Sequence, residues 1–299
     1  MKIARLLIPF LAVGLTVPAT VSSAAPGAMP GAAPAPVVPT LVDIRAGHRD
    51  AVDRIVYEFK GGVPESVRVR YVDELRGDAS DLPIRIAGQA VLRVRFELAK
   101  AHNASGQTAP ARIAFPLPNI MTTVRSGDFE AVTTYGIGLA KRARFRVVRL
   151  DDPARVVIRV RAGFPTVDRK VFFFNEDRYL ANNEPFFVPR LRPVRPVAPA
   201  TGVMDRLFAG PLPKERAHGL RLLRSAAKDY ADLSIEDGVA RVRLTGGCSS
   251  GGSTVSIAGE IMPTLRQFDS VDWVKIYDPA GTTEVPTGDV DSIPECLEP

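Results

Sequence analysis

Residues 90–98, AVLRVRFEL, alternate apolar and charged side chains and so indicate a β-strand with one buried and one exposed face. Similar runs occur at residues 54–59, 66–72, 142–150 and 155–160. Asp151-Asp152-Pro153 separates the last two runs, and we interpret it as a turn. Several short strands joined by turns, with no comparable helical period, predict an all-β antiparallel sandwich over residues 41–163.

The second half of the chain, residues 167–299, mixes helical and strand patterns and predicts an α+β domain. Helices are predicted over residues 201–208, over a short segment that begins at Pro213 and carries Glu215, Leu220 and Leu223, and over residues 254–268 with a kink at Pro263. Strands are predicted over residues 170–174, 233–236, 239–244 and 273–277. Asp237-Gly238 is typical of a tight hairpin turn. The run 185–191 contains two prolines, so it can be an edge strand at best.

The composition of the 299 residues is that of a globular protein, with 45% hydrophobic and 24% charged residues. It excludes a mainly disordered chain, a collagen-like repeat and a small scaffold that depends on many disulfides. The length suggests two domains, residues 41–163 and 167–299, each large enough to bury a core of its own.

The N-terminus has the pattern of an export signal. Lys2 and Arg5 precede an apolar stretch and a small-residue cleavage motif, so residues 1–24 are predicted to be a signal peptide. The apolar stretch is shorter than the roughly 20 residues of a membrane-spanning helix, although an uncleaved anchor is the alternative. Residues 25–40, rich in Pro and Ala, are predicted to be a linker. We therefore expect a secreted protein associated with the cell envelope, with no integral membrane segment after signal cleavage.

The two cysteines, Cys248 and Cys296, are predicted to form a disulfide, because an exported protein meets an oxidising compartment. The bridge would close a loop of 49 residues and hold the C-terminal tail against an earlier loop. Two cysteines and the scattered His48, His102 and His218 do not supply a metal site. The sequence also has no phosphate-binding loop or dinucleotide fingerprint, so no cofactor is expected.

The second domain resembles a known module in five segments that keep their order and spacing. These are residues 207–215 (LFAGPLPKE), 219–220 (GL), 237–242 (DGVARV), 261–268 (IMPTLRQF) and 271–276 (VDWVKI). Together they resemble the GerMN domain, the module named from the spore-germination protein GerM. The resemblance implies a β-α-β-β-α-β arrangement like that of ring-building modules, and it brings no defined catalytic site. The loop 246–252 and the disulfide-pinned tail depart from the pattern.

The first domain is similar to the AMIN-like domain that accompanies such modules in exported envelope proteins. The similar segments are residues 43–48, 53–59, 70–72 and 150–158. AMIN domains target amidases and secretion components to the cell wall, and they too bring no defined catalytic site. The resemblance therefore implies binding or assembly.

An enzymatic alternative comes from Gly247-Cys248-Ser249-Ser250-Gly251, which matches the G-x-S-x-G motif of serine hydrolases. The order of residues in those enzymes requires an acid and a histidine after the serine, and no histidine follows His218. We favour a Gly/Ser loop beside the disulfide and expect no enzyme, with an envelope hydrolase as the alternative. The hydrolase requires a histidine within hydrogen-bond reach of Ser249.

Arginines recur at positions i and i+2 in strand after strand. The sets are Arg68/Arg70, Arg93/Arg95, Arg142/Arg144/Arg146, Arg159/Arg161 and Arg241/Arg243. Strand alternation places each set on one face. Residues 43–163 carry 21 Lys+Arg against 14 Asp+Glu, so the basic charge belongs to the first domain.

Two interpretations of these arginines are open. A guanidinium-rich face can bind an anionic polymer through bidentate hydrogen bonds. The candidate binding residues are Arg142, Arg144, Arg146, Arg93 and Arg95. Alternatively, the arginines only solvate an outer sheet face and pair with residues such as Glu58 and Glu97.

The favoured hypothesis is a non-enzymatic envelope protein. Its first domain would bind peptidoglycan or another anionic envelope polymer, and its GerMN-like domain would bind envelope proteins or self-assemble. Export argues against nucleic acid as the partner of the basic face. A carrier with a small-ligand cleft between the domains is a third possibility, without a residue signature.

Overall fold

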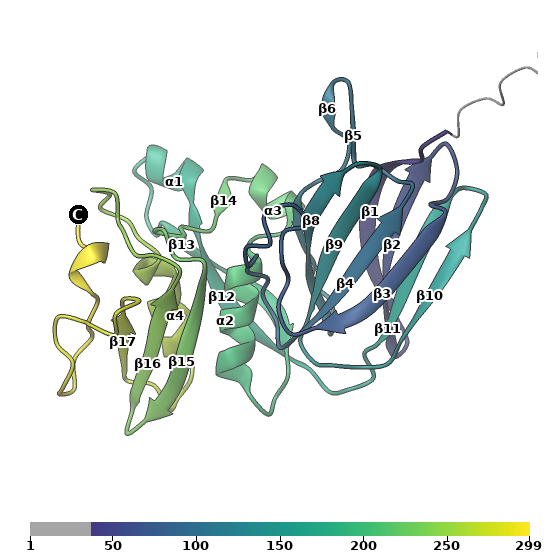
Figure 1. Ribbon diagram of the computed structural model, residues 1–299. Coiled ribbons are helices and arrows are strands. Elements are labelled where there is room, and N and C mark those ends of the chain that lie inside the picture. Colours follow the sequence, from purple (N-terminus) through teal and green to yellow (C-terminus); the bar gives the residue numbers. More distant parts are fainter. Residues whose placement is uncertain (1–36) are drawn as a thin grey trace, which may run out of the picture. The chain divides into compact units, whose positions relative to one another are not determined.

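The computed structural model describes residues 37–299, so the predicted signal peptide and most of the predicted linker lie outside the described residues. Among residues 37–299, no helix combines the length and apolar character needed to cross a membrane. Strands dominate the first part of this range, and helices accompany strands in the second (Figure 1). The predicted fold classes, a β domain followed by an α+β domain, are confirmed.

The first domain consists of two antiparallel sheets (Figure 1). One sheet has the order β1 (Thr40–Arg49), β2 (Val52–Lys60), β11 (Arg155–Arg161) and β10 (Phe145–Leu150). The other has the order β3 (Ser66–Val72), β4 (Ala90–Glu97), β9 (Val132–Leu139), β8 (Ile120–Phe129) and β7 (Arg112–Ala114). β5 (His102–Asn103) and β6 (Gly106–Gln107) form a separate small hairpin.

Aromatic side chains from both sheets meet in the sandwich core. The Tyr57 ring of β2 lies 5.0 Å from that of Phe96 in β4 and 5.6 Å from that of Tyr135 in β9. Ile55 and Tyr57 are fully buried, whereas Arg54, which precedes Ile55, is exposed. Period-2 alternation therefore builds the core on one face of the sheet and leaves a basic row on the other.

The second domain contains two three-stranded sheets. Their strand orders are β13 (Phe187–Val194), β12 (Val167–Asn175), β14 (Leu220–Arg221), and β15 (Asp229–Glu236), β16 (Val239–Thr245), β17 (Trp273–Tyr277). The helices are α1 (Glu176–Leu180), α2 (Pro199–Ala209), α3 (Pro213–Ala217), α4 (Ala258–Arg266) and a 3₁₀ turn at Glu295–Leu297. α4 connects the parallel strands β16 and β17, and its buried Ile261 and Leu265 join the core with residues of α2. Asp237 (φ 50°) and Gly238 (φ 75°) both adopt the left-handed conformation that the predicted hairpin turn requires.

Among the predicted boundaries that differ from the structure, three have a clear local reason. The strand expected from Arg142 begins at Phe145, because the Tyr71 hydroxyl takes up both backbone groups of Ala143 that a strand would use. The helix at Pro213 ends at Ala217, and Gly219 with φ 76° lies just beyond it, so Leu220 belongs to β14 and Leu223 follows that strand. The helix expected from Thr254 begins at Ala258, after the backbone N–H of Ile257 has bonded to the Ser225 hydroxyl.

Arg206 of α2 joins the second domain to the first. Its guanidinium donates to the carbonyls of Phe115 and Leu117 in the first domain and to that of Pro193 in the second. The neighbouring Asp205 is also buried; its carboxylate accepts hydrogen bonds from Gln89 Nε2 and from the Tyr230 hydroxyl, both at 2.9 Å. Consecutive residues of one helix therefore contact both domains.

Candidate functional site

A pocket of about 870 Å³ brings together arginines from separate predicted sets. It is lined by Val52, Tyr71, Arg142, Ala143, Arg144, Phe145, Arg146, Arg159 and Arg161. All five arginines are exposed. We call this pocket the arginine groove.

The pairing of the strands explains why these arginines converge. Arg146 of β10 lies directly opposite Arg159 of β11, which in turn lies opposite Arg54 of β2. Ile158 and Val160, on either side of Arg159, are fully buried. The row Arg54, Arg159, Arg146 therefore points away from the core across three neighbouring strands, which lie about 4.8 Å apart.

A second level of the groove lies one pleat further along the sheet. The backbone N–H of Arg161 donates to the carbonyl of Arg144 just before β10, and Arg161 lies opposite Val52. Successive side chains on one face of a strand are about 6.7 Å apart. The groove thus presents two rows of guanidinium groups, with Arg142 beyond them.

The arginines of this surface have no carboxylate partner. Within residues 37–299, Arg54 and the five arginines of the groove form neither a salt bridge nor a hydrogen bond through their side chains. Their fork-shaped donors are therefore directed to solvent and available to an external anion.

Tyr71 and Phe145 form the apolar side of the groove. The guanidinium carbon of Arg142 lies 4.1 Å from the centroid of the Tyr71 ring, which is a cation–π contact. The edge of one ring faces the other, with centroids 5.8 Å apart. The Tyr71 hydroxyl is engaged with the backbone of Ala143. Tyr71 thus holds the loop that carries Arg142.

The other two candidate binding residues, Arg93 and Arg95, lie on β4 of the opposite sheet and do not line the groove. Arg93 donates to Asp78 at 2.8 Å, and Arg95 contacts Glu97 at 3.3 Å. Asp78 also accepts a hydrogen bond from the hydroxyl of Thr134. The pairing interpretation of the arginines therefore describes β4, whereas the arginines of the groove are unpaired.

The sequence pattern found some of the groove and missed the rest. The pattern predicts Arg159 and Arg161 as a strand-face pair but does not predict that they face Arg144 and Arg146. Arg54, Tyr71 and Phe145 carried no signal that a single sequence could reveal, because their roles depend on strand order. Alternating arginines in the adjacent runs 142–150 and 155–160 could have suggested a hairpin with a shared basic face.

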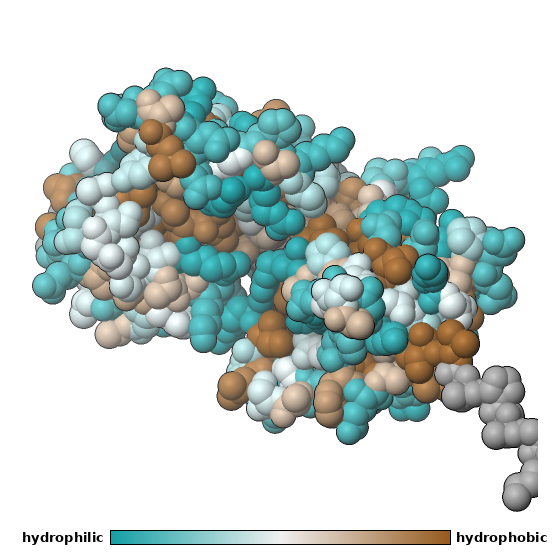
Figure 2. All heavy atoms as spheres, turned by 90° about the horizontal axis from the view of Figure 1, so that it is seen from above, coloured by the Kyte–Doolittle hydropathy of each residue, from teal (hydrophilic) through white to brown (hydrophobic). Residues whose placement is uncertain are grey.

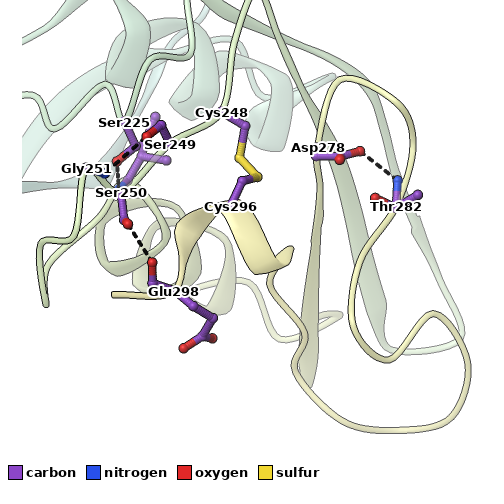
Figure 3. The surroundings of a disulfide bond; sticks show 10 residues. Ser225, Cys248, Ser249, Ser250, Gly251, Asp278, Thr282, Cys296 and Glu298 are labelled. Atoms are coloured by element: carbon purple, nitrogen blue, oxygen red, sulfur yellow. Dashed lines mark hydrogen bonds between the residues drawn. A yellow bond between two sulfur atoms is a disulfide. The ribbon is translucent and has the colours of Figure 1, made fainter.

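The Ser249 loop lies beside the disulfide (Figure 3). Cys248 and Cys296 are bonded, with Cα atoms 5.7 Å apart, and the hydroxyl of Ser250 donates to the carbonyl of Glu298. The Ser249 hydroxyl accepts a hydrogen bond from the backbone N–H of Gly251. These bonds hold the C-terminal tail against the loop.

The three histidines are bonded elsewhere. Nδ1 of His48 contacts Asp53, Nδ1 of His102 contacts Asp128, and Nδ1 of His218 contacts the carbonyl of Lys214. No histidine within residues 37–299 forms a hydrogen bond with Ser249. The same residues contain no group of three or more His, Cys, Asp or Glu that could hold a metal ion.

On the face of the molecule shown in Figure 2, hydrophobic residues form separate patches among hydrophilic ones. The most exposed large hydrophobic side chains in the described range come from well-separated segments, among them Phe129, Leu180, Leu191 and Val197. Isolated apolar residues of this kind are normal on a protein surface. The arginine groove, rather than an apolar surface, is therefore the candidate site.

These observations define a two-domain protein, an antiparallel β-sandwich with a basic groove followed by a disulfide-containing α+β domain. Residues 39–162 match the family model described as an AMIN-like domain, and residues 170–277 match the one described as sporulation and spore germination. Both predicted resemblances are confirmed.

Among solved structures, the chain is similar to the tandem GerMN domains of the sporulation protein GerM from Bacillus subtilis. The identity is 18%, the TM-score is 0.29, and the match covers 44% of this chain and 44% of that one. The match therefore spans less than half the length of that protein. No curated protein matches the chain.

Proposed function

We propose that this protein is a non-enzymatic component of the cell envelope, whose AMIN-like domain binds an anionic wall polymer through the arginine groove. The two domain types support an envelope- or sporulation-related protein that acts outside the cytoplasm. The observation that carries the proposal is the contrast between the two sheets. Arg93 and Arg95 are neutralised by carboxylates of the same domain, whereas the arginines of the groove have none.

Unpaired like charges in one groove repel one another, which an anionic ligand would relieve. Guanidinium groups suit this role because each one donates two parallel hydrogen bonds to a carboxylate or phosphate. The fixed strand register holds Arg146, Arg159 and Arg54 in one row before any ligand arrives. Such preorganisation lowers the entropic cost of binding.

The GerMN domain is proposed to serve as a scaffold that contacts envelope proteins through side-chain surfaces rather than by strand addition. β13 is an edge strand that contains Pro189 and Pro193. β15 is an edge strand interrupted by an irregularity at Asp232, which has φ 54°. Prolines and bulges at sheet edges oppose pairing with another strand.

The absence of catalysis is part of the same proposal. A serine hydrolase needs a base in contact with its nucleophile. The hydrogen bonds of Ser249 and Ser250 instead join the loop to its own backbone and to the tail, which is a structural use of a Gly/Ser segment.

The test is co-sedimentation of the purified protein with cell-wall sacculi over a series of salt concentrations. A triple Ser variant at Arg142, Arg144 and Arg146 should lose most of the salt-sensitive binding, because it removes three of the five cations of the groove. The matched control is a triple Ser variant at Arg68, Arg93 and Arg95, which loses the same charge from the opposite sheet. Equal loss in both triple variants would show general charge attraction and contradict a specific groove.

A further inference from the structure

The two aromatic side chains of the arginine groove are only partly exposed, and they contact each other and Arg142. Carbohydrate rings are usually bound against an open aromatic face, and Tyr71 and Phe145 are the aromatic residues of this groove. Arg142 already covers the Tyr71 ring at 4.1 Å, and the other ring stands edge to face with it. The hydroxyl of Tyr71 is also occupied by the backbone of Ala143. These contacts favour an anion over the face of a sugar as the group that the groove recognises.

The spacing of the arginines indicates how far apart the negative charges of a fitting ligand should lie. Neighbouring arginines within a row stem from strands about 4.8 Å apart, and the two rows lie about 6.7 Å apart along the sheet. The carboxylates of a peptidoglycan strand belong to its peptide stems, so several closely spaced anions are not regularly available there. A phosphodiester chain carries one negative charge at every repeat of a flexible backbone, with two non-bridging oxygens on each phosphate.

The opposed pair Arg146 and Arg159 favours a tetrahedral oxyanion. The two residues share one position in the register of β10 and β11, so their side chains flank the same point of the groove. The two non-bridging oxygens of a phosphodiester accept hydrogen bonds from a wide range of directions, so each can bond to a different guanidinium group, whereas a carboxylate accepts best in its own plane.

On these grounds, and resting on the proposed function, we infer that the groove binds a wall-attached phosphodiester polymer rather than peptidoglycan itself. The polymer lies along the two rows of arginines with successive phosphates between opposed guanidinium groups. The peptidoglycan serves only as the support to which this polymer is attached.

The experiment compares binding of the full protein to sacculi that retain their phosphodiester polymers and to sacculi from which hydrofluoric acid has removed them. We expect binding to fall at least tenfold on the stripped sacculi. Inorganic polyphosphate should displace the protein from intact sacculi at a lower charge concentration than polygalacturonate. A double Ser variant at Arg146 and Arg159 should bind more weakly, because three of the five arginines of the groove remain, while the same change at Arg93 and Arg95 should leave binding unchanged.

The number of ions released gives a second readout. If four or five arginines contact phosphates, the logarithm of the polyphosphate affinity should fall with the logarithm of salt concentration with a slope of about −3. The double Ser variant at Arg146 and Arg159 should reduce that slope by about 1 to 1.5.

The outcomes separate this inference from the proposed function. Equal binding to intact and stripped sacculi, weakened in the groove variant, would overturn the phosphodiester inference and leave wall binding by the groove in place. Stronger displacement by polygalacturonate than by polyphosphate would have the same meaning. No binding to either preparation would overturn both.

Discussion

Arg146 and Arg159 lie directly opposite each other across the β10–β11 pair, and neither forms a salt bridge within residues 37–299. Like charges in directly opposed positions of an antiparallel pair destabilise it. A fold that keeps such a pair, with Arg54 as the next residue in the row, gives up stability at the surface where we place the ligand. Sites that retain unfavourable contacts in the free protein are commonly functional.

Removing one of these charges should therefore stabilise the free protein. We expect Arg159→Ser to raise the free energy of unfolding by about 0.5 kcal/mol at low ionic strength. The reason is that Arg159 lies between Arg146 and Arg54, so its removal ends the repulsion with both. The gain should shrink at high salt, where the repulsion is screened. Thermal unfolding at two salt concentrations measures it. Arg95→Ser is the control and should give no gain, since Arg95 contacts Glu97 and Asp78. A loss of stability in Arg159→Ser at low salt would contradict repulsion in the groove.

The sequence was most informative where local chemistry decides the structure. The Asp237-Gly238 turn, the strand 273–277 and the edge position of the run after Pro185 were all predictable, because turn conformation and the missing proline N–H act within a few residues. The alternation pattern does not predict the strands β1, β7, β8 and β9. β9 is an example: seven of its eight residues are buried, so it shows no polar alternation.

The candidate site was only partly predictable because it depends on which strands are neighbours. Arg142, Arg144 and Arg146 form one set in the sequence pattern and all line the groove, yet the pattern does not fix Arg159 opposite Arg146 or Arg93 beside Asp78. Those relationships join residues that are 13 and 15 positions apart through turns whose geometry a residue pattern does not specify. Long-range register is therefore the information that single-sequence reasoning lacks.

Arg206 should couple the unfolding of the two domains. Arg206→Met keeps most of the side-chain volume but leaves the carbonyls of Phe115, Leu117 and Pro193 without their donor. Burial lowers the pKa of Arg206 to about 9, which shows that the buried charge is poorly solvated. Replacing it with an uncharged side chain removes this unfavourable contribution and offsets part of the loss of hydrogen bonds. We expect a net loss of about 2 kcal/mol.

Urea unfolding followed by tryptophan fluorescence and far-ultraviolet circular dichroism tests this coupling. Trp273, the single tryptophan, reports on the second domain. The two probes should coincide in the wild type and separate in Arg206→Met. Arg195→Met is the control, because the Arg195 side chain forms no hydrogen bond in the described part of the chain. Coincident transitions in Arg206→Met would contradict the coupling.

Two buried carboxyl groups should make the protein less stable as the pH rises. Burial raises the pKa of Asp205 to about 6 and that of Glu260 to about 8. Each folded-state pKa lies above the ordinary value, so the folded state binds more protons and this stability is lost as pH rises through the folded pKa. The expected loss is at most about 1.4 kcal/mol per pH unit for each group, from about pH 4 to 6 for Asp205 and about pH 4.5 to 8 for Glu260.

Urea unfolding at half-unit steps from pH 5 to pH 8 measures these slopes. Glu260→Gln should flatten the dependence between pH 6 and 8, and Asp205→Asn should flatten it below pH 6. The comparison is between slopes, because each substitution also alters hydrogen bonds to the backbone of Phe174 or to the side chain of Gln89. If the stability of the wild type increases from pH 6 to 8, Glu260 is not held protonated in the folded state, and the prediction is wrong.

The disulfide should stabilise the second domain by restricting the unfolded chain. The Cys248–Cys296 bridge spans 48 positions, and loop-closure entropy gives such a bridge about 4 kcal/mol, often less in practice. Cys248→Ser/Cys296→Ser should therefore lower the urea midpoint of the Trp273 signal. It should also release the tail, because Ser250 can bond to the carbonyls of Cys296 and Glu298 only while the tail lies against the loop.

Limited proteolysis should then cut after Tyr277 in the variant before it cuts elsewhere. If the arginine groove acts independently, sacculus binding by the variant should equal that of the wild type at temperatures where both are folded, and a parallel loss of binding would place the tail in the binding surface.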